Sequence, residues 1–339
     1  MLINIAEDSD LIMPQDPKKD FLAQIEDTTD PYYKSVLERV YREQIDVENP
    51  IPIETKINVI KQKIASSSPE EIVYSFLPHE MAKIPIFFPM SDKELKTDRR
   101  LLHTMTTESK WGMAEIRGIK LSLFEEDVLL ALIRMAKDDL KPTNKELVLD
   151  TSLAKIVRFL FGKKGYGNGS YKSISGSLKN LGLIGFTLYI YAASENGFGK
   201  KVSREISVSA IIPHYNIDHT TGRVVIKFNP DFFSYLSESS LTNINFTLRR
   251  RLKKSGSKAL IRFLSTHRNL SRLNLLTVLN AINFNVKQPK FALRRYLKEC
   301  FNELKKVGVL GPKAKLYPDD TVFFDVNTRI LKPRKSLPK

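Results

Sequence analysis

The sequence predicts an α+β fold in which a set of three helices followed by a β-hairpin occurs twice, after a partly helical N-terminal extension. The expected helices show apolar residues at every third or fourth position, and the expected hairpins alternate apolar and polar residues on both sides of a turn. Three helices followed by a hairpin wing form a winged helix-turn-helix, so we expect two such domains in tandem. The predicted boundaries are residues 1–83 for the extension, 84–245 for the first domain and 246–339 for the second.

The N-terminal extension is acidic. Residues 1–70 hold 8 basic and 14 acidic side chains. Residues 1–30 lack periodicity, which is typical of a flexible arm, whereas apolar spacing predicts helices over residues 30–46 and 53–65.

The first domain opens with an apolar segment, KIPIFFPMS at residues 83–91, whose prolines favour a docked strand or tether over a helix. A strand over 113–121, a helix over 123–137 and a second helix over 149–161 follow by periodicity. The third helix, Ser170 to Leu181, has its apolar residues at i, i+4 and i+7. A hairpin over residues 185–212, a strand over 222–228 and a helix over 229–239 complete the domain.

The pentapeptide Lys120–Phe124, KLSLF, permits two interpretations. Ser122 and Glu125 have the spacing of a capping box at the start of a helix, which makes Leu121, Leu123 and Phe124 core residues. The same letters are similar to the Gln-Leu-Ser-Leu-Phe peptide by which many bacterial proteins dock on the replication sliding clamp, with Lys120 in place of glutamine. We favour the cap and core, and retain a sliding-clamp contact through these three side chains as the alternative.

The second domain repeats the order of elements. Helices are predicted over residues 255–268, 273–282 and 287–310, and the hairpin KLYPDDTVFFDV at 315–326 supplies a wing. Pro289 suits the first turn of the third helix and Gly308 suits its C-terminal cap. The core stripe of this helix is Leu293, Leu297, Cys300 or Phe301, and Leu304.

Charge indicates a polyanionic partner. The chain has a net charge of +16, and residues 245–339 alone carry 23 basic and 5 acidic side chains. Nucleic acid is favoured over a membrane, because no hydrophobic anchor accompanies this charge. A single cysteine and the absence of a secretory signal in the sequence favour a cytoplasmic location, on the nucleoid or a plasmid.

The candidate DNA contacts lie on the third helix of each domain and on the connector LRRRLKKSGSK. An arginine can bond guanine and a glutamine can bond adenine through paired hydrogen bonds, whereas lysines neutralise phosphates. A solvated basic face is the competing interpretation, and for the first domain the two are evenly matched. The candidates are Lys287, Gln288, Lys290, Arg294, Arg295 and Lys298 in the second domain, Tyr171, Lys172, Ser175 and Lys179 in the first, and Arg249, Arg250, Arg251, Lys253 and Lys254 in the connector.

The sequence offers no catalytic constellation. His214 and His219 are five residues apart in a predicted loop, with no histidine triad and nucleophilic tyrosine of the kind a nicking enzyme needs. We therefore expect no enzymatic activity, no metal and no other cofactor.

The order of these elements resembles the winged-helix plasmid replication initiators, most closely the TrfA type of broad-host-range plasmids. The resemblance covers about residues 84–325 and rests on KIPIFFPMSDKELKTDRRLL, IRGIKLSLFEEDVLLALIRMAK, GNGSYKSISGSLKNLGLIGF, SGSKALIRFLSTHR and LRRYLKECFNELKKVGVL. It implies an initiator that binds directly repeated origin DNA, helps to melt an adjacent AT-rich stretch and recruits host replication proteins such as the sliding clamp, the host initiator and the helicase. It also implies an exchange between homodimers and DNA-binding monomers, with Ser170–Leu181 and Pro289–Val307 as the two DNA readers.

Two other functions compete with initiation. A winged-helix transcriptional repressor would use the same helices without melting or recruitment. A rolling-circle nickase or primase is the least favoured, because the acidic and histidine ligands of such enzymes are missing from the sequence.

Overall fold

The computed structural model describes residues 73–90, 103–143, 146–162, 167–192, 201–267 and 270–331, together with Thr55 and Glu94. The chain divides into two units, Met1–Pro52 and Ile53–Lys339, and all described residues belong to the second. The predicted arm and most of the two predicted N-terminal helices thus lie outside the described residues. No helix in the described ranges is long and apolar enough to cross a membrane.

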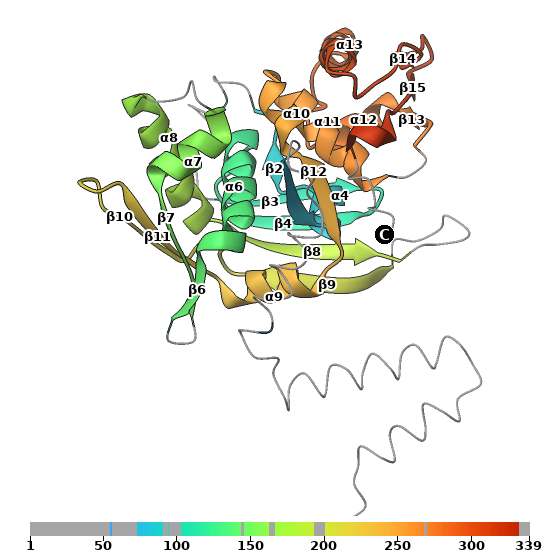
Figure 1. The fold of residues 1–339 in the computed structure, drawn as a ribbon. Helices are drawn as coiled ribbons and strands as arrows, with labels where there is room; N and C mark the ends of the chain where they lie inside the picture. Colours follow the sequence, from blue (N-terminus) through green and yellow to red (C-terminus); the bar gives the residue numbers. More distant parts are fainter. Residues whose placement is uncertain are drawn as a thin grey trace, which may run out of the picture. The chain divides into compact units, whose positions relative to one another are not determined.

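The first winged-helix domain has the predicted order of three helices and a hairpin (Figure 1). These are α6 (Leu123–Asp139), α7 (Leu153–Phe161), α8 (Asn168–Gly182), β8 (Gly185–Tyr191) and β9 (Val202–Val208). The second helix begins at Leu153 rather than at Leu149. Residues 149–152 instead belong to β7 (Glu146–Ser152), which pairs with β6 (Leu140–Thr143) and with β11 (Arg223–Phe228).

Two antiparallel sheets extend the first domain. One has the order β3-β4-β8-β9, where β3 is His103–Ser109 and β4 is Gly112–Gly118. The other has the order β10-β11-β7-β6, where β10 is His214–Ile217, and is followed in the chain by α9 (Pro230–Glu238). The prediction of a loop is wrong for His214, because His214–Ile217 is strand β10 and pairs with Val224–Lys227, whereas His219 lies in the turn that follows β10.

Helix α6 lies at the centre of the first domain, and its residues from Val128 to Ile133 are all buried. Among its neighbours are β1 (Tyr74–Pro78), which pairs with β12 (Leu241–Asn245), and β2 (Phe87–Phe88), which pairs with β5 (Leu121–Ser122). Helix α4 (His79–Lys83) follows β1 in the chain and packs on α11 (Ser255–Thr266) of the second domain. Residues 74–83, assigned from sequence to the extension, therefore build the core.

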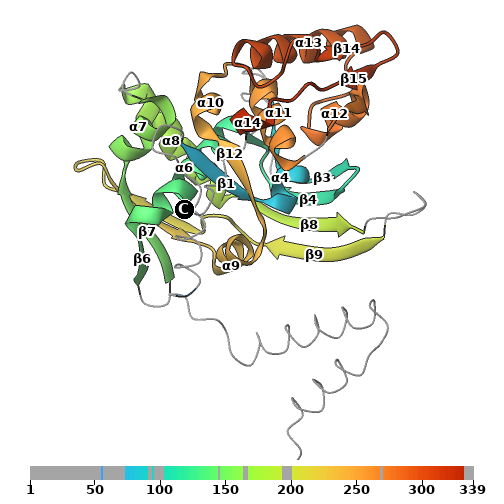
Figure 2. The ribbon, with the colours of Figure 1, turned by 45° about the vertical axis from the view of Figure 1, so that its right-hand side comes forward.

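The second winged-helix domain also follows its predicted order (Figure 2). Its elements are α10 (Phe246–Arg251), α11 (Ser255–Thr266), β13 (Arg272–Asn274), α12 (Leu275–Ala281), α13 (Lys290–Lys306), β14 (Lys315–Leu316), β15 (Thr321–Phe323) and α14 (Thr328–Leu331).

Helices α11 and α13 pack closely in the core of this domain. The predicted stripe of α13 is buried throughout, with both Cys300 and Phe301 inside. Gly256 permits the approach, because a Cβ there would lie 2.3 Å from the Tyr296 hydroxyl oxygen and 2.8 Å from the Cys300 sulfur. Pro289 is the N-cap of α13, and Gly308 has the positive φ of 77° that its predicted place after the helix requires.

A buried ionic cluster joins the two domains. Glu126 and Asp127 of α6 face Arg249 of α10 and Lys258 and Arg262 of α11, and both arginine side chains are 0% exposed. Glu126 lies 3.2 Å from Arg249 and 2.5 Å from Arg262, whereas Asp127 pairs with Arg249 and lies 2.6 Å from Lys258. Burial lowers the pKa of Arg249, but Asp127 and Glu126 outweigh burial and keep this pKa above its usual value. The carboxylates therefore hold buried cations that otherwise have no compensating charge.

Replacing Glu126 with glutamine is expected to lower the free energy of unfolding by about 3–5 kcal/mol, because one partner of a buried charge cluster is removed. Urea denaturation measures the change. Glu205→Gln on the exposed side of β9 is the control and should shift stability by less than about 0.5 kcal/mol. Equal midpoints for Glu126→Gln and the parent would contradict a stabilising cluster.

The chain's single thiol should be unreactive while the second domain is folded. Burial raises the pKa of Cys300 to about 12, so the thiolate that attacks disulfide reagents is nearly absent at pH 8. Native protein mixed with a chromogenic disulfide at pH 8 should react only at the rate at which α11 and α13 separate. Urea-unfolded protein, whose thiol has its ordinary pKa, should react at once. Immediate reaction of the native protein would show that this helix contact is wrong.

Candidate nucleic-acid interface

The start of α13 and the wing formed by β14 and β15 lie together at the edge of the second domain (Figures 1 and 2). Arg294 and Lys290 reach from the helix to the wing tip. Arg294 donates a 2.8 Å hydrogen bond from Nη2 to the Tyr317 carbonyl and pairs with Asp320, to which Lys290 also lies at 2.5 Å. Lys290 and Arg294 lower the pKa of Asp320, so this carboxylate stays charged at neutral pH.

Arg294 consequently has a different role from the one its sequence position indicates. Its side chain is only 21% exposed, and its guanidinium is occupied by the wing tip. Asp320 adopts a positive φ of 65° at the turn, which a non-glycine residue holds only when its surroundings fix it. We conclude that Arg294 positions the wing on α13, and that its predicted contact with a base would require this bond to break.

The remaining candidates of α13 are open to solvent. Arg295 is 79% exposed, although its Nε donates a 3.1 Å hydrogen bond to Glu299. Gln288, Lys290 and Lys298 are exposed as well. Sequence reasoning missed Phe291, which is 73% exposed on the same helix. The sequence could have shown this, because Phe291 does not fall on the helix face that Leu293, Leu297 and Leu304 bury.

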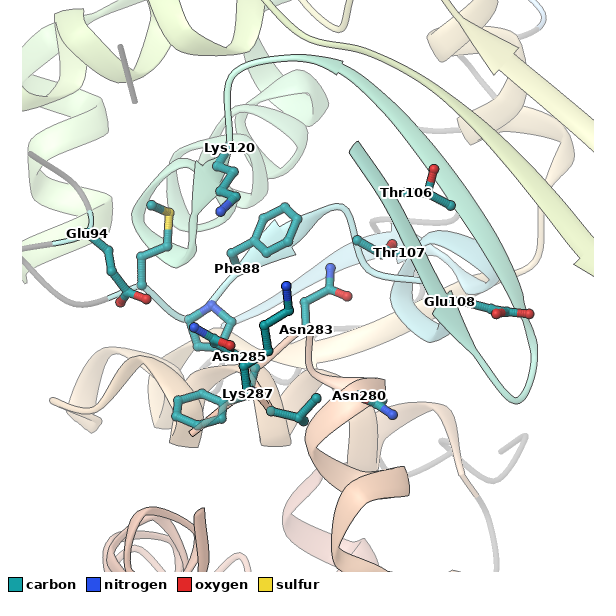
Figure 3. Close-up of a pocket in the computed structure, with 14 residues that line it drawn as sticks. Phe88, Glu94, Thr106, Thr107, Glu108, Lys120, Asn280, Asn283, Asn285 and Lys287 are labelled. Carbon is teal, nitrogen blue, oxygen red and sulfur yellow. Dashed lines mark hydrogen bonds between the residues drawn. The ribbon is translucent and has the colours of Figure 1, made fainter. Parts of the chain in front are cut away.

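Lys287 lies where the two domains meet. It lines a depression of about 440 Å³ whose other wall includes Phe88 and Lys120 of the first domain (Figure 3). The Lys120 ammonium is 5.9 Å from the centre of the Phe88 ring. Asn283 closes this region by donating a hydrogen bond to the Pro85 carbonyl. The loop that precedes α13 is therefore fixed to the first domain.

The connector is folded rather than extended, and its basic side chains differ in burial and in their partners. The prediction that Arg249 contacts phosphate is wrong, because its guanidinium is buried in the ionic cluster. Arg250 donates a 3.1 Å hydrogen bond to the Phe159 carbonyl, and the Lys254 ammonium lies 2.8 Å from Glu299. The side chains of Arg251 and Lys253 are exposed, so their phosphate contacts stay predictions.

Helix α8 presents a face of small and basic residues. Lys172 and Lys179 are exposed, whereas Tyr171 and Ser175 are half-buried and Tyr171 packs against the core. Sequence reasoning missed the glycines of this face. A Cβ added at Gly169 or Gly176 would meet nothing within 4 Å, so the backbone of α8 is accessible there. The sequence could have shown this, because two glycines seven residues apart, about two helical turns, lie on the same helix face.

The capping interpretation of Lys120–Phe124 is confirmed. The Ser122 backbone N–H donates a 2.8 Å hydrogen bond to Glu125, and the Phe124 N–H donates a 3.1 Å hydrogen bond to the Ser122 hydroxyl. Leu121 and Leu123 are buried and Phe124 stacks on Phe161. A docking peptide needs free side chains, so the alternative of a sliding-clamp contact does not fit Leu121 and Leu123, which are buried, or Phe124, which is half-buried against Phe161.

Glu125 also sets the position of α8. Its second carboxylate oxygen accepts hydrogen bonds from Asn180 at 3.0 Å and from Ser177 at 3.3 Å. The cap of α6 thus anchors the C-terminal half of α8, which leaves the face with Lys172 and Gly176 outward.

No group of three or more histidine, cysteine, aspartate or glutamate side chains within the described ranges is arranged to hold a metal ion. His214 lies on β10 and His219 in the turn between β10 and β11, and both side chains are exposed.

Residues 113–265 match the family model described as the WH1 domain of initiator replication proteins. Over this segment the chain is therefore similar to the WH1 domain of initiator replication proteins. The WH1 match extends from β4 to α11, and thus includes the three helices and hairpin of the first domain and both sides of the ionic cluster. It does not test the likeness to the TrfA type, which stays a prediction.

Several solved structures resemble the chain at low identity. The Pi initiator protein in complex with iteron DNA is 13% identical with a TM-score of 0.44, and the match covers 76% of this chain and 99% of Pi. Domains 2 and 3 of RctB are 11% identical with a TM-score of 0.43, and the match covers 69% of this chain and 86% of RctB. A second RctB structure is 13% identical with a TM-score of 0.42, covering 70% and 85%. No curated protein sequence matches the chain, and the WH1 assignment rests on the family model.

Arg294→Ala and Arg295→Ala are expected to differ in their effect on DNA binding. Arg295→Ala should reduce discrimination between a selected duplex and a shuffled one by about 1–3 kcal/mol, the range for a paired arginine–guanine contact. Arg294→Ala should weaken binding to both duplexes similarly and increase amide exchange in β15, because it loosens the wing. Competition binding and hydrogen exchange measure these effects. Loss of discrimination in Arg294→Ala with an unchanged wing would reverse the two roles.

Gly176→Gln tests whether α8 lies against DNA. Glutamine favours a helix more than glycine does, so the variant should be more stable by about 0.5 kcal/mol. Its bulk should nevertheless weaken DNA binding about tenfold, a cost near 1.4 kcal/mol. Gly176→Ala, which adds one methyl group, is the control and should be stabilised with little loss of affinity. Unchanged affinity in Gly176→Gln would remove α8 from the interface.

Proposed function

We propose that the protein is a plasmid replication initiator that binds directly repeated, iteron-like origin DNA through both winged-helix domains and promotes opening of the origin. The observation that carries this proposal is the WH1 match over residues 113–265, in a chain whose second domain places an exposed basic helix beside a wing.

The geometry supports different roles for different side chains of the second domain, some reading bases and others contacting phosphates. In winged helices the start of the third helix enters the major groove while the wing contacts the backbone. Gln288 and Arg295 are exposed at this end of α13 and have the donors that read adenine and guanine. Lys290 and Lys298 are suited to phosphate, and Arg294 keeps the wing in place beside them.

The double-stranded origin DNA is the principal partner. We further propose that the bound protein recruits host replication proteins such as the initiator and the helicase, and that a homodimer exchanges with a DNA-binding monomer. Any contact with the sliding clamp would use a surface other than the buried Leu121 and Leu123. The proposed function needs no catalysis, metal or cofactor, and acts on plasmid DNA in the cytoplasm.

Origin-dependent plasmid maintenance tests the proposal. A plasmid without an origin of its own receives fragments of the DNA that flanks the gene, and the chain is supplied from a second replicon. Stable inheritance of a fragment that contains repeats is expected, and Arg295→Ala with Lys298→Ala should abolish it. The single variant Glu205→Gln serves as the control and should support replication.

Three results would contradict the proposal. Binding to the repeats without maintenance of any fragment would favour a transcriptional repressor. Metal-dependent cleavage of single-stranded origin DNA would favour a nickase. Failure to select any DNA sequence would exclude both the initiator and the repressor.

A further inference from the structure

Phe291 is an exposed aromatic side chain in the first turn of α13. It is 73% exposed, the largest value among the big apolar side chains in the described part of the chain. It is the second residue of α13, after the N-cap Pro289 and Lys290. A phenylalanine in this setting contributes little to folding, because most of its ring stays in water and it forms helix less readily than alanine does.

The side chains on the same helix face as Phe291 indicate what kind of partner would cover its ring. Phe291, Arg295 and Lys298 are spaced at i, i+4 and i+7, so they share the helix face opposite Cys300. Arg295 and Lys298 on this stripe are exposed, as are Lys290 and Gln288 beside it. An exposed apolar ring with the exposed cations Arg295 and Lys298 on the same helix face fits a surface that is anionic at its edges and has an apolar group at its centre. The DNA major groove has these properties, with phosphates along both sides and the thymine C5-methyl group on its floor.

We infer that Phe291 determines sequence specificity by packing its ring on the C5-methyl group of a thymine in the major groove. This inference rests on the proposed function and names one base, thymine, that the protein would recognise. Arg295 and Gln288 have hydrogen-bond donors, which match purine edges. Phe291 has none and can discriminate only through shape and apolar contact. Thymine is the one DNA base with an apolar group in the major groove, so the recognised site contains a thymine within reach of the first turn of α13.

Uracil substitution tests the inference, because it removes the methyl group and keeps base pairing. The intact chain first selects a duplex from a random pool, and each thymine of that duplex is then replaced by deoxyuridine in turn. At one or two positions the parent chain should lose affinity by about three- to tenfold, as burial of one methyl group predicts. Phe291→Ala should bind the thymine duplex more weakly by a similar factor and should be insensitive to uracil at those positions.

Phe161→Ala is the matched control, because Phe161 is another partly exposed phenylalanine, at the end of α7. This variant should keep the uracil effect of the parent. Thermal unfolding should give Phe291→Ala a midpoint close to that of the parent, since the ring is mostly in solvent.

Three outcomes would overturn the inference. The first is a selected duplex in which no uracil substitution changes the affinity of the parent. The second is a Phe291→Ala variant that keeps the full uracil effect. The third is a change in the sedimentation of the DNA-free chain on Phe291→Ala, which would assign the ring to contact with a second copy. If the chain selects no sequence at all, the proposed function fails, so the two failures are distinguishable.

Discussion

The ionic cluster between α6 and the pair α10 and α11 is the interaction on which the arrangement of the two winged helices depends. Helix α6 is the buried centre of the first domain, and its two adjacent acidic residues, Glu126 and Asp127, are enclosed by cations of the second. Neither domain can bury its half of the cluster alone, because unpaired charges in a protein interior cost several kcal/mol each. The charges therefore couple the folding of each domain to their docking.

This coupling has consequences for DNA recognition. Strand β1 pairs with β12, and the Asn283 side chain donates a hydrogen bond to the Pro85 carbonyl, so hydrogen bonds also link chain segments far apart in sequence. The capped start of α6 fixes α8 through Glu125, and Arg294 fixes the wing beside α13. Helices α8 and α13 are apart from each other in both views of the ribbon, so each presents its own outward face (Figures 1 and 2). We propose that DNA meets these two helices at a fixed spacing.

Local signals in the sequence were sufficient for most helices and for the cap of α6. The spacing of Ile174, Leu178 and Leu181 predicted the buried side of α8, and Ser122 with Glu125 predicted the capping box, because both patterns involve residues within a few turns. Strands β1 and β12 could not be predicted as a pair, since Tyr74 and Asn245 meet only in the folded chain. Arg249 was misassigned for the same reason: its charge was visible in the sequence, but its partner Asp127 is 122 residues away. Exposure also depends on the tertiary fold. The sequence does not distinguish Arg294 from Arg295, but in the structure Arg294 bonds to the wing and Arg295 is exposed.

The central claim is that α8 and α13, held in one body, are the surfaces that bind DNA. Hydrogen–deuterium exchange of the intact chain, with and without a duplex that it selects, tests this claim most directly. The account predicts protection of residues 168–182, of residues 287–298 and of the wing at 315–323, with no change in β10. Protection confined to β10 and β11, or to the first domain alone, would contradict it.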